Sequence, residues 1–417
     1  MHLNVDKPDT MQTEKVHITA TGLAPHRLFT MVMKVRHNYG THSATATFRS
    51  NAAGCIDLQT DAPIRGTYSG AEPMGLFMSQ MPLEDFAYGG YLRCTPPVPF
   101  YYELSLYDEK EKELDHIVIK KHWMHPNLTR MEVEYEGFYG TLFKPPGDGP
   151  FPCVMDISGT GGGIHEHKGS MLASEGFTFP EKLEDVDIDY FKKPIDFLLS
   201  LPYTGDRFGI QGVSFGGTLV DIITSRFPQF KAAVVINGPQ GQCSYMHIKE
   251  HGKNMPVIGM DDTKWYFLNG IISTQLCHKT MTDYMTEETE TEWARIPKDC
   301  VFRLVGSMDD LCSPSIHSTF YRKKRLNETG HEVEVELVNG GHIMEPPYFP
   351  HHQIVYAKFQ AFYCGYGGEP VLHGKSQEKS WANTISFFKK VLGDTPRMPD
   401  WPRLQHVQRP VDNRSHL

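Results

Sequence analysis

The pattern of hydrophobic and polar positions changes about one third of the way along the chain. Between residues 16 and 123, short segments rich in β-branched and aromatic residues alternate with turn residues, and no long helical pattern occurs. Strands at this spacing are typical of a β-sandwich. We therefore predict an N-terminal β-sandwich domain, Ig-like in architecture, over residues 14–125. Its expected strands are residues 16–20, 28–35, 44–48, 101–106 and 117–120.

Beyond a connector at 126–130, apolar strands alternate with helical segments. Residues 133–143 predict a β-hairpin and 151–157 a buried strand. Continuous apolar strands between helices indicate a mostly parallel sheet covered on both faces. We predict an α/β domain over residues 131–395 and an exposed tail over 396–417. The further expected strands are 208–211, 232–236, 301–305 and 333–338, and the expected helices are 191–201, 218–226 and 377–392.

One turn in this second domain has the pattern of a catalytic nucleophile. An apolar strand runs into Gly-Val-Ser-Phe-Gly, residues 212–216, and a helical segment follows. A serine on a sharp strand-to-helix turn is the nucleophile elbow of the α/β-hydrolase fold. The glycines fit because side chains there would collide with the turned backbone. We predict that Ser214 is the nucleophile.

A serine nucleophile needs a base, and the base needs an acid to orient it. In this fold the chain order is Ser, acid, His. Strand 333–338 leads into a Gly-Gly turn and His342, and strand 301–305 leads into Asp309 and Asp310. We assign His342 as the base. The two neighbouring aspartates are hard to separate by pattern, because adjacent turn residues point in different directions, and we favour Asp309.

The oxyanion of such a reaction needs backbone donors. We expect them at Phe215, which follows the nucleophile, and at Gly159 and Thr160 in the glycine loop after strand 151–157. This loop lacks the Lys-Ser/Thr of a nucleotide-binding P-loop. His165 and His167 lie beside it without a third ligand in a recognisable pattern, so we interpret them as surface residues and expect no metal site.

Composition narrows the possible functions. The 417 residues carry a formal net charge of -9, which argues against a nucleic-acid partner. The 8 cysteines include no Cys-x-x-Cys pair, as expected in a reducing compartment. No stretch approaches the ~18 apolar residues that span a bilayer, and the first residues do not resemble a signal peptide. We expect no cofactor.

Several segments resemble a known family. The glycine loop, the turn around Ser214, residues 233–238 and above all the His-Ile-Met-Glu-Pro-Pro-Tyr-Phe-Pro run at 342–350 are similar to acyl-CoA thioesterases related to bile acid-CoA:amino acid N-acyltransferase. Segments 21–25, 71–76 and 140–143 extend the resemblance over almost the whole chain. It implies the triad Ser214, Asp309 and His342, the aspartate being chosen by its distance after Gly306.

The resemblance also implies an activity. Members that conjugate acyl groups to amino acids typically have cysteine as the nucleophile, whereas thioesterases have serine, so Ser214 favours hydrolysis of fatty acyl-CoA through an acyl-serine intermediate. The alternatives are N-acyl transfer to glycine or taurine, and a catalytically impaired chain that keeps the fold. The last arises because an apolar central strand of the family and its following loop, on the order of a dozen residues, are expected after Gly176 and are absent from the sequence. Loss of a strand beside the nucleophile strand would expose apolar surface and could misplace Ser214.

The last three residues, Ser415, His416 and Leu417, fit a variant of the Ser-Lys-Leu peroxisomal signal. We expect recognition by the peroxisomal import receptor and a peroxisomal location, with a cytoplasmic location as the alternative.

Overall fold

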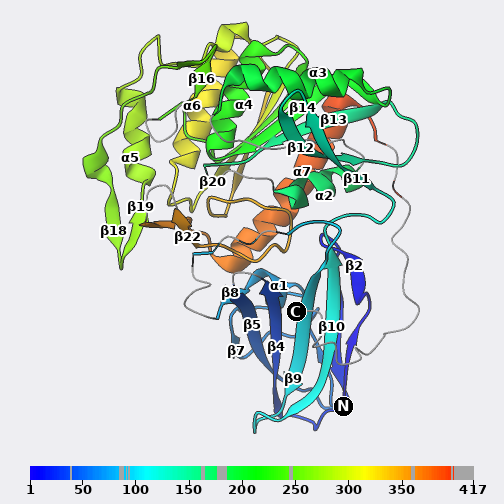
Figure 1. Ribbon diagram of the computed structural model, residues 1–417. Helices are drawn as coiled ribbons and strands as arrows, with labels where there is room; N and C mark the ends of the chain where they lie inside the picture. Colours follow the sequence, from blue (N-terminus) through cyan, green and yellow to red (C-terminus); the bar gives the residue numbers. More distant parts are fainter. Residues whose placement is uncertain are drawn as a thin grey trace. The chain divides into compact units, whose positions relative to one another are not determined.

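The computed structural model describes residues 1–37, 40–83, 89–90, 92, 94–160, 165–175, 186–243, 248–357, 362–395 and 398. These residues form two compact units. The first contains Met1–Trp123 and Pro346–His351, and the second contains Met124–Glu345 and the described part of His352–Pro399. Figure 1 shows Met1–Trp123 of the first unit in blue to cyan and most of the second unit in green to orange.

The first unit is built from two β-sheets. One has the strand order β1-β3-β6, and the other has the order β2-β10-β9-β4-β5-β7 with β8 paired to β5. Along β4 and β9, buried positions alternate with more exposed ones, as expected for strands that cover a core with one face. The elements are β1 (His2–Val5), β2 (Asp9–Met11), β3 (Ile18–Thr21), β4 (Leu28–His37), β5 (Gly40–Arg49), β6 (Ile56–Asp57), β7 (Arg65–Gly66), α1 (Gly75–Met78), β8 (Met81–Pro82), β9 (Phe100–Tyr107) and β10 (Glu113–His122).

A parallel five-stranded sheet, in the order β13-β14-β15-β20-β21, is the centre of the second unit. Its strands are β13 (Phe151–Ile157), β14 (Thr204–Val213), β15 (Phe230–Ile236), β20 (Val301–Ser307) and β21 (Val333–Val338). The antiparallel hairpin β11 (Thr129–Tyr135) and β12 (Phe138–Lys144) precedes the sheet, as predicted. The sequence pattern therefore identified each strand of this sheet.

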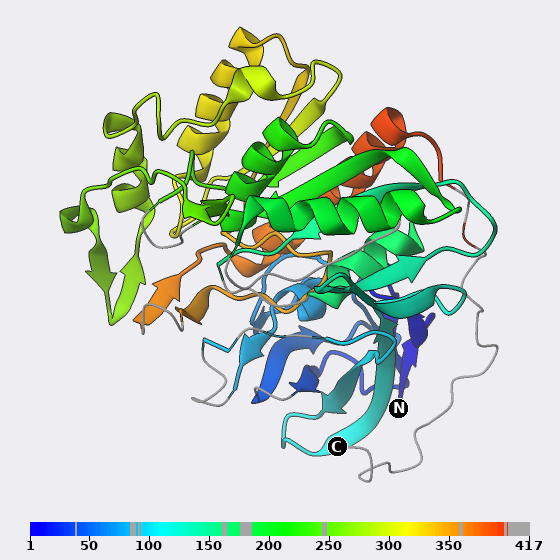
Figure 2. The ribbon, with the colours of Figure 1, turned by 45° about the horizontal axis from the view of Figure 1, so that its top comes forward.

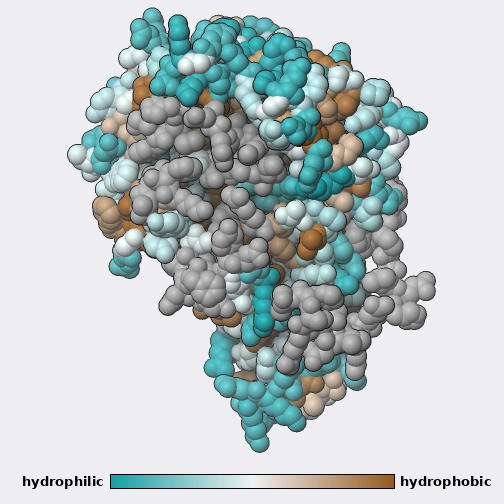
Figure 3. All heavy atoms as spheres, in the orientation of Figure 1, coloured by the Kyte–Doolittle hydropathy of each residue, from teal (hydrophilic) through white to brown (hydrophobic). Residues whose placement is uncertain are grey.

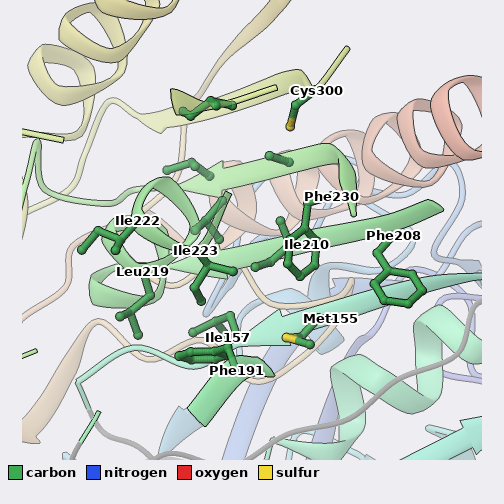
Figure 4. Close-up of a cluster of buried hydrophobic side chains, with 14 of the residues drawn as sticks. Met155, Ile157, Phe191, Phe208, Ile210, Leu219, Ile222, Ile223, Phe230 and Cys300 are labelled. Carbon is green, nitrogen blue, oxygen red and sulfur yellow. The ribbon is translucent and has the colours of Figure 1, made fainter. Parts of the chain in front are cut away.

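Helices cover both faces of the sheet, because most positions of its inner strands are buried on both sides. On one face, Met155, Ile157 and Ile210 pack with residues of α3, α4 and α6 (Figure 4). On the other, Val154 and Val234 pack with residues of α2 and α7. Figures 1 and 2 show α3 and α4 across the sheet from α7. The helices are α2 (Glu166–Ser174), α3 (Lys192–Ser200), α4 (Phe215–Arg226), α5 (Gln275–Lys279), α6 (Ser315–Glu328) and α7 (Pro370–Leu392), with short 3-10 helices at Ile188–Phe191, Asp262–Lys264, Thr280–Asp283 and Trp293–Arg295.

Helix α7 is longer than predicted. Trp381, Ile385, Phe388 and Leu392 lie on the face toward the sheet, as the pattern indicated. The helix nevertheless begins at Pro370, capped by the Glu369 carboxylate, which accepts from the Leu372 amide at 2.7 Å. Its first two turns bury His373 and Gly374 instead of large apolar residues, so they give no apolar stripe.

Small strands between the main elements were not predicted. They are β16 (Lys249–Glu250), β17 (Lys253–Asn254), β18 (Tyr266–Leu268), β19 (Ile271–Ser273), β22 (Ile354–Ala357) and β23 (Phe362–Gly365). The last four form a sheet in the order β18-β19-β23-β22. Apolar side chains gather at the tip of the β18–β19 hairpin, where Phe267 is 70% exposed (Figure 3). No helix in the described ranges is long and apolar enough to cross a membrane.

The nucleophile strand has neighbours on both sides. β14 pairs with β13 on one edge and with β15 on the other. β14 is therefore flanked on both edges, but the expectation that a central strand of the family is missing stays untested. The segment after Gly176 to which that expectation referred, residues 176–185, lies outside the described residues, as does most of the predicted tail.

Candidate active site

Ser214 lies on a sharp turn between β14 and α4. Its backbone has φ 58° and ψ −127°, a region that L-residues rarely adopt. A Cβ on Gly212 would lie 2.2 Å from the Gly216 carbonyl oxygen, and one on Gly216 would lie 2.2 Å from the Ile157 carbonyl oxygen. Only glycine fits at either position. The turn thus has the geometry that the sequence predicted.

His342 lies opposite this serine, on the loop after β21. Its Nε2 is 2.8 Å from the Ser214 Oγ, and the residue is 1% exposed. Its backbone N–H donates to the Tyr366 carbonyl at 2.7 Å, and the Tyr366 ring centroid lies 4.9 Å from that of the imidazole. The structure therefore brings the predicted base and nucleophile into hydrogen-bond contact.

The acid beside His342 is Asp310, and our choice of Asp309 was wrong in geometry. Asp310 Oδ2 lies 2.8 Å from His342 Nδ1. Asp310 is 1% exposed, and its Oδ1 accepts from the amides of Cys312 and Ser313 at 2.8 and 2.9 Å. Asp309 is exposed and accepts from the Gly368 amide at 2.9 Å. The two side chains point in different directions from one turn, which a distance along the sequence cannot distinguish.

The environment of His342 sets its protonation. Burial lowers the pKa of the imidazole, but the Asp310 carboxylate and the neighbouring Cys312 raise it more, so the net pKa lies above the ordinary value. Because a carboxylate only accepts, Nδ1 donates to Asp310. The neutral imidazole then presents the lone pair of Nε2 to the Ser214 hydroxyl, as a general base requires.

The expected oxyanion donors lie on both sides of the nucleophile. Phe215 is the first residue of α4, where a helix has no carbonyl to accept from its N–H. A Cβ on Gly159 would lie 3.2 Å from the Cβ and 3.7 Å from the Oγ of Ser214, so the glycine backbone approaches the nucleophile closely. Thr160 follows as a half-buried residue. Residues 161–163 of the loop lie outside the described residues.

The interpretation of His165 and His167 as surface residues was wrong for His167. This residue is fully buried, and its Nε2 lies 2.9 Å from Glu345 Oε2. Lys168, also buried, lies 3.3 Å from Glu345 Oε1. These contacts link α2 to the loop that contains His342. Within the described ranges, no cluster of His, Cys, Asp and Glu is arranged to hold a metal ion.

Two residues around the site had no predicted role. Glu345 follows His342 by three positions, and Asn237 follows strand β15, where its side chain contacts the loop of His342. Both belong to segments on which the family resemblance was based, but a polar residue after a strand does not indicate by itself which loop it contacts.

Two family models match most of the chain. Residues 186–394 match the model described as "BAAT / Acyl-CoA thioester hydrolase C terminal", and residues 13–135 match "Acyl-CoA thioester hydrolase/BAAT N-terminal region". The chain belongs to the BAAT/acyl-CoA thioester hydrolase family.

Relatives in this family extend over nearly the whole length of the chain. Acyl-coenzyme A thioesterase 5 of Mus musculus is 31% identical, over 92% of this chain and 95% of the relative. Peroxisomal succinyl-coenzyme A thioesterase of Mus musculus is 29% identical, over 92% and 94%. Bile acid-CoA:amino acid N-acyltransferase of Mus musculus is 28% identical, over 91% and 95%. The resemblance seen in the sequence is thereby confirmed.

Proposed function

We propose that this protein hydrolyses fatty acyl-CoA thioesters to fatty acid and CoA through an acyl-Ser214 intermediate. The observation on which the proposal rests is the continuous hydrogen-bonded chain from Asp310 through His342 to Ser214, with both links at 2.8 Å. Relatives named as thioesterases supply the substrate class.

The geometry suggests the following first half-reaction. As Ser214 Oγ attacks the thioester carbonyl carbon, Nε2 of His342 takes the hydroxyl proton, and Asp310 stabilises the imidazolium. The carbonyl oxygen becomes an oxyanion that the N–H groups of Phe215 and Gly159 or Thr160 can stabilise. When the carbon–sulfur bond breaks, the imidazolium returns the proton to the CoA sulfur, and an ester of Ser214 remains.

Water completes the reaction. His342 takes a proton from a water molecule as its oxygen attacks the ester carbonyl, and it then protonates Ser214 Oγ as the fatty acid leaves. The same intermediate could instead be attacked by an amine. Because one relative is named an amino acid N-acyltransferase, transfer to glycine or taurine is the second candidate function.

Free thiol released from palmitoyl-CoA separates these candidates. We expect wild-type protein to release CoA without any amino acid, and Ser214→Ala to abolish the release. An amide product that forms only when glycine or taurine is added would show that the protein catalyses N-acyl transfer and not hydrolysis. No release and no amide from a protein that melts cooperatively would support the impaired chain and overturn the proposed activity.

We also propose import into peroxisomes through Ser415, His416 and Leu417, which lie outside the described residues. The 29% identity to a relative named as a peroxisomal thioesterase supports this location. A fluorescent reporter that ends in residues 406–417 should become punctate in cells, and one without the last three should remain diffuse. A diffuse signal from both would favour the cytoplasmic alternative.

A further inference from the structure

The strand between the nucleophile strand and the acid strand ends in an unusual residue. Asn237 follows β15 with φ 51°, a left-handed conformation that asparagine tolerates better than most residues. It is 1% exposed, and its own N–H donates to the Val305 carbonyl at 3.0 Å. Asn237 lies within segment 233–238, one of the segments that resemble the family.

Its side-chain amide joins the acid strand to the loop of the base. Nδ2 donates to the carbonyl oxygen of His342 at 2.7 Å, to that of Gly341 at 3.2 Å and to the Ser307 hydroxyl at 2.8 Å. Oδ1 accepts from the Ser307 backbone N–H at 2.8 Å. Since an amide N–H only donates, Ser307 N–H must face Oδ1, and this fixes the NH₂ group toward the two carbonyls.

The loop that receives these bonds needs external support. It leaves β21 at Val338 and passes through Gly340 and Gly341, which restrict backbone rotation less than other residues do. The N–H of His342 is held by the Tyr366 carbonyl at 2.7 Å, and its carbonyl by Asn237. Asn237 thus holds one of the two backbone polar groups of the base, and through Ser307 it connects that group to the end of β20.

We propose that Asn237 is a positioning residue for the base. It keeps the backbone of Gly341 and His342 at the end of β20, so that the imidazole stays between Asp310 and Ser214. Asparagine suits this position because its planar amide donates to the carbonyl of His342 and accepts from the N–H of Ser307 at the end of β20. The inference rests on the proposed role of the triad but not on which acyl group is the substrate.

The test measures how fast Ser214 reacts with a fluorophosphonate, a probe that labels activated serines and requires no acyl-CoA. In Asn237→Asp, an oxygen replaces the NH₂ group and faces two carbonyls. In Asn237→Gly, the left-handed backbone is retained and the amide is lost. We expect labelling of both variants to fall by about 100-fold, the effect of a misplaced catalytic group. We expect the turnover number for palmitoyl-CoA to fall likewise, with KM within about threefold.

The pH dependence of labelling tests positioning specifically. An imidazole that slips away from Asp310 loses the carboxylate that raises its pKa, so the midpoint of the labelling rate in Asn237→Gly should move to lower pH. Asn383→Ala is the matched control. Asn383 is a half-buried asparagine of α7 whose Nδ2 donates to Glu336 Oε1 at 2.7 Å. This control should lose some thermal stability and keep both the wild-type labelling rate and its pH midpoint.

Folded Asn237→Gly that labels within threefold of wild type would overturn the inference. Slow labelling with an unchanged pH midpoint would also overturn it and would assign Asn237 to general packing. If Asn237→Asp does not fold, the glycine variant decides. Wild-type protein that is labelled at Ser214 but releases no CoA would contradict the proposed substrate alone, whereas absence of labelling would contradict the triad and the inference together.

Discussion

The nucleophile turn, residues 212–217, and the acid turn, residues 307–315, both follow strands of the same sheet but depend on different information. In the nucleophile turn, one of the collisions that require glycine lies within the motif itself. A Cβ on Gly212 would collide with the Gly216 carbonyl four residues later. A short motif is therefore enough to predict the turn on which the serine lies.

In the acid turn, two adjacent aspartates compete for one role. Part of the outcome is local, because Asp310 also binds the amides of Cys312 and Ser313 and the hydroxyl of Ser315 at the start of α6. The contact that decides its role comes from His342, 32 positions away. A site can thus be predicted from sequence where the contacts that define it lie within one motif. The prediction fails where a distant loop determines which of two adjacent aspartates contacts the histidine.

Loss of the nucleophile tests the first turn most directly. We expect Ser214→Ala to lower the turnover number for acyl-CoA by about 10⁴–10⁶-fold, because the proposed acyl intermediate forms on the hydroxyl that this variant lacks. Free CoA release measures the effect, and a thermal melt verifies that the variant is folded. Residual activity above one hundredth of wild type would show that Ser214 is not the nucleophile.

Paired substitutions test the second turn. Asp310→Asn should lower the turnover number by about 10³–10⁴-fold, since the amide cannot stabilise the imidazolium. Asp309→Asn is the matched control. This variant keeps an oxygen that can accept from the Gly368 amide. We therefore expect the turnover number to fall by less than about fivefold, which corresponds to about 1 kcal/mol, the contribution of one hydrogen bond. The opposite ranking would restore Asp309 as the acid.

The pH dependence sharpens the same contrast. The base must be neutral to accept the Ser214 proton, and its pKa in the folded protein is raised. Activity should therefore be lost as pH falls through a midpoint above about 6.5, the ordinary value for histidine. In Asp310→Asn that midpoint should move to lower pH, because a carboxylate that raises the pKa is gone. Rates from pH 5 to 9 measure both midpoints, and an unmoved midpoint would contradict the electrostatic role of Asp310.

The smallest effect concerns the glycines. Gly216→Ala should destabilise the protein by about 3 kcal/mol, because its Cβ must displace two backbone carbonyls. Gly330→Ala is the control. Gly330 has φ +78° and no atom within 4 Å of its Cβ position, so only the left-handed conformation is penalised, by about 1 kcal/mol. Thermal melts compare the two, and equal shifts would contradict the collision at Gly216, whose backbone is not in the left-handed region.

Much of the second unit could be predicted because the spacing of apolar residues along a strand or helix indicates which positions are buried. Strand β21 was predicted with its observed bounds, and β14 was recognised from its buried end, although its first residues are exposed. The accessory sheet β18-β19-β23-β22 was not predicted. Its strands are short and its hairpin tip is exposed, so neither alternation nor a long apolar run marks them.

His167 shows why the burial of a polar residue cannot be predicted from the pattern of apolar positions. Nothing in its neighbourhood along the chain distinguishes it from a surface histidine, whereas in the structure its Nε2 contacts Glu345, 178 positions away. The segment Pro346–His351 likewise belongs to the first unit although it is far from the rest of that unit along the chain. No local pattern predicts such an assignment.

The sequence by itself determined the serine turn, the order of strands and helices around it and the family, because these depend on residues close together in the chain. The tertiary structure alone decided which aspartate contacts His342, where His167 lies and what the amide of Asn237 binds. For Asp310 and Asn237 the contact depends on the direction in which the side chain leaves its turn, which the paired strands of the sheet set. For His167 it depends on the packing of helix α2 against the loop that contains Glu345.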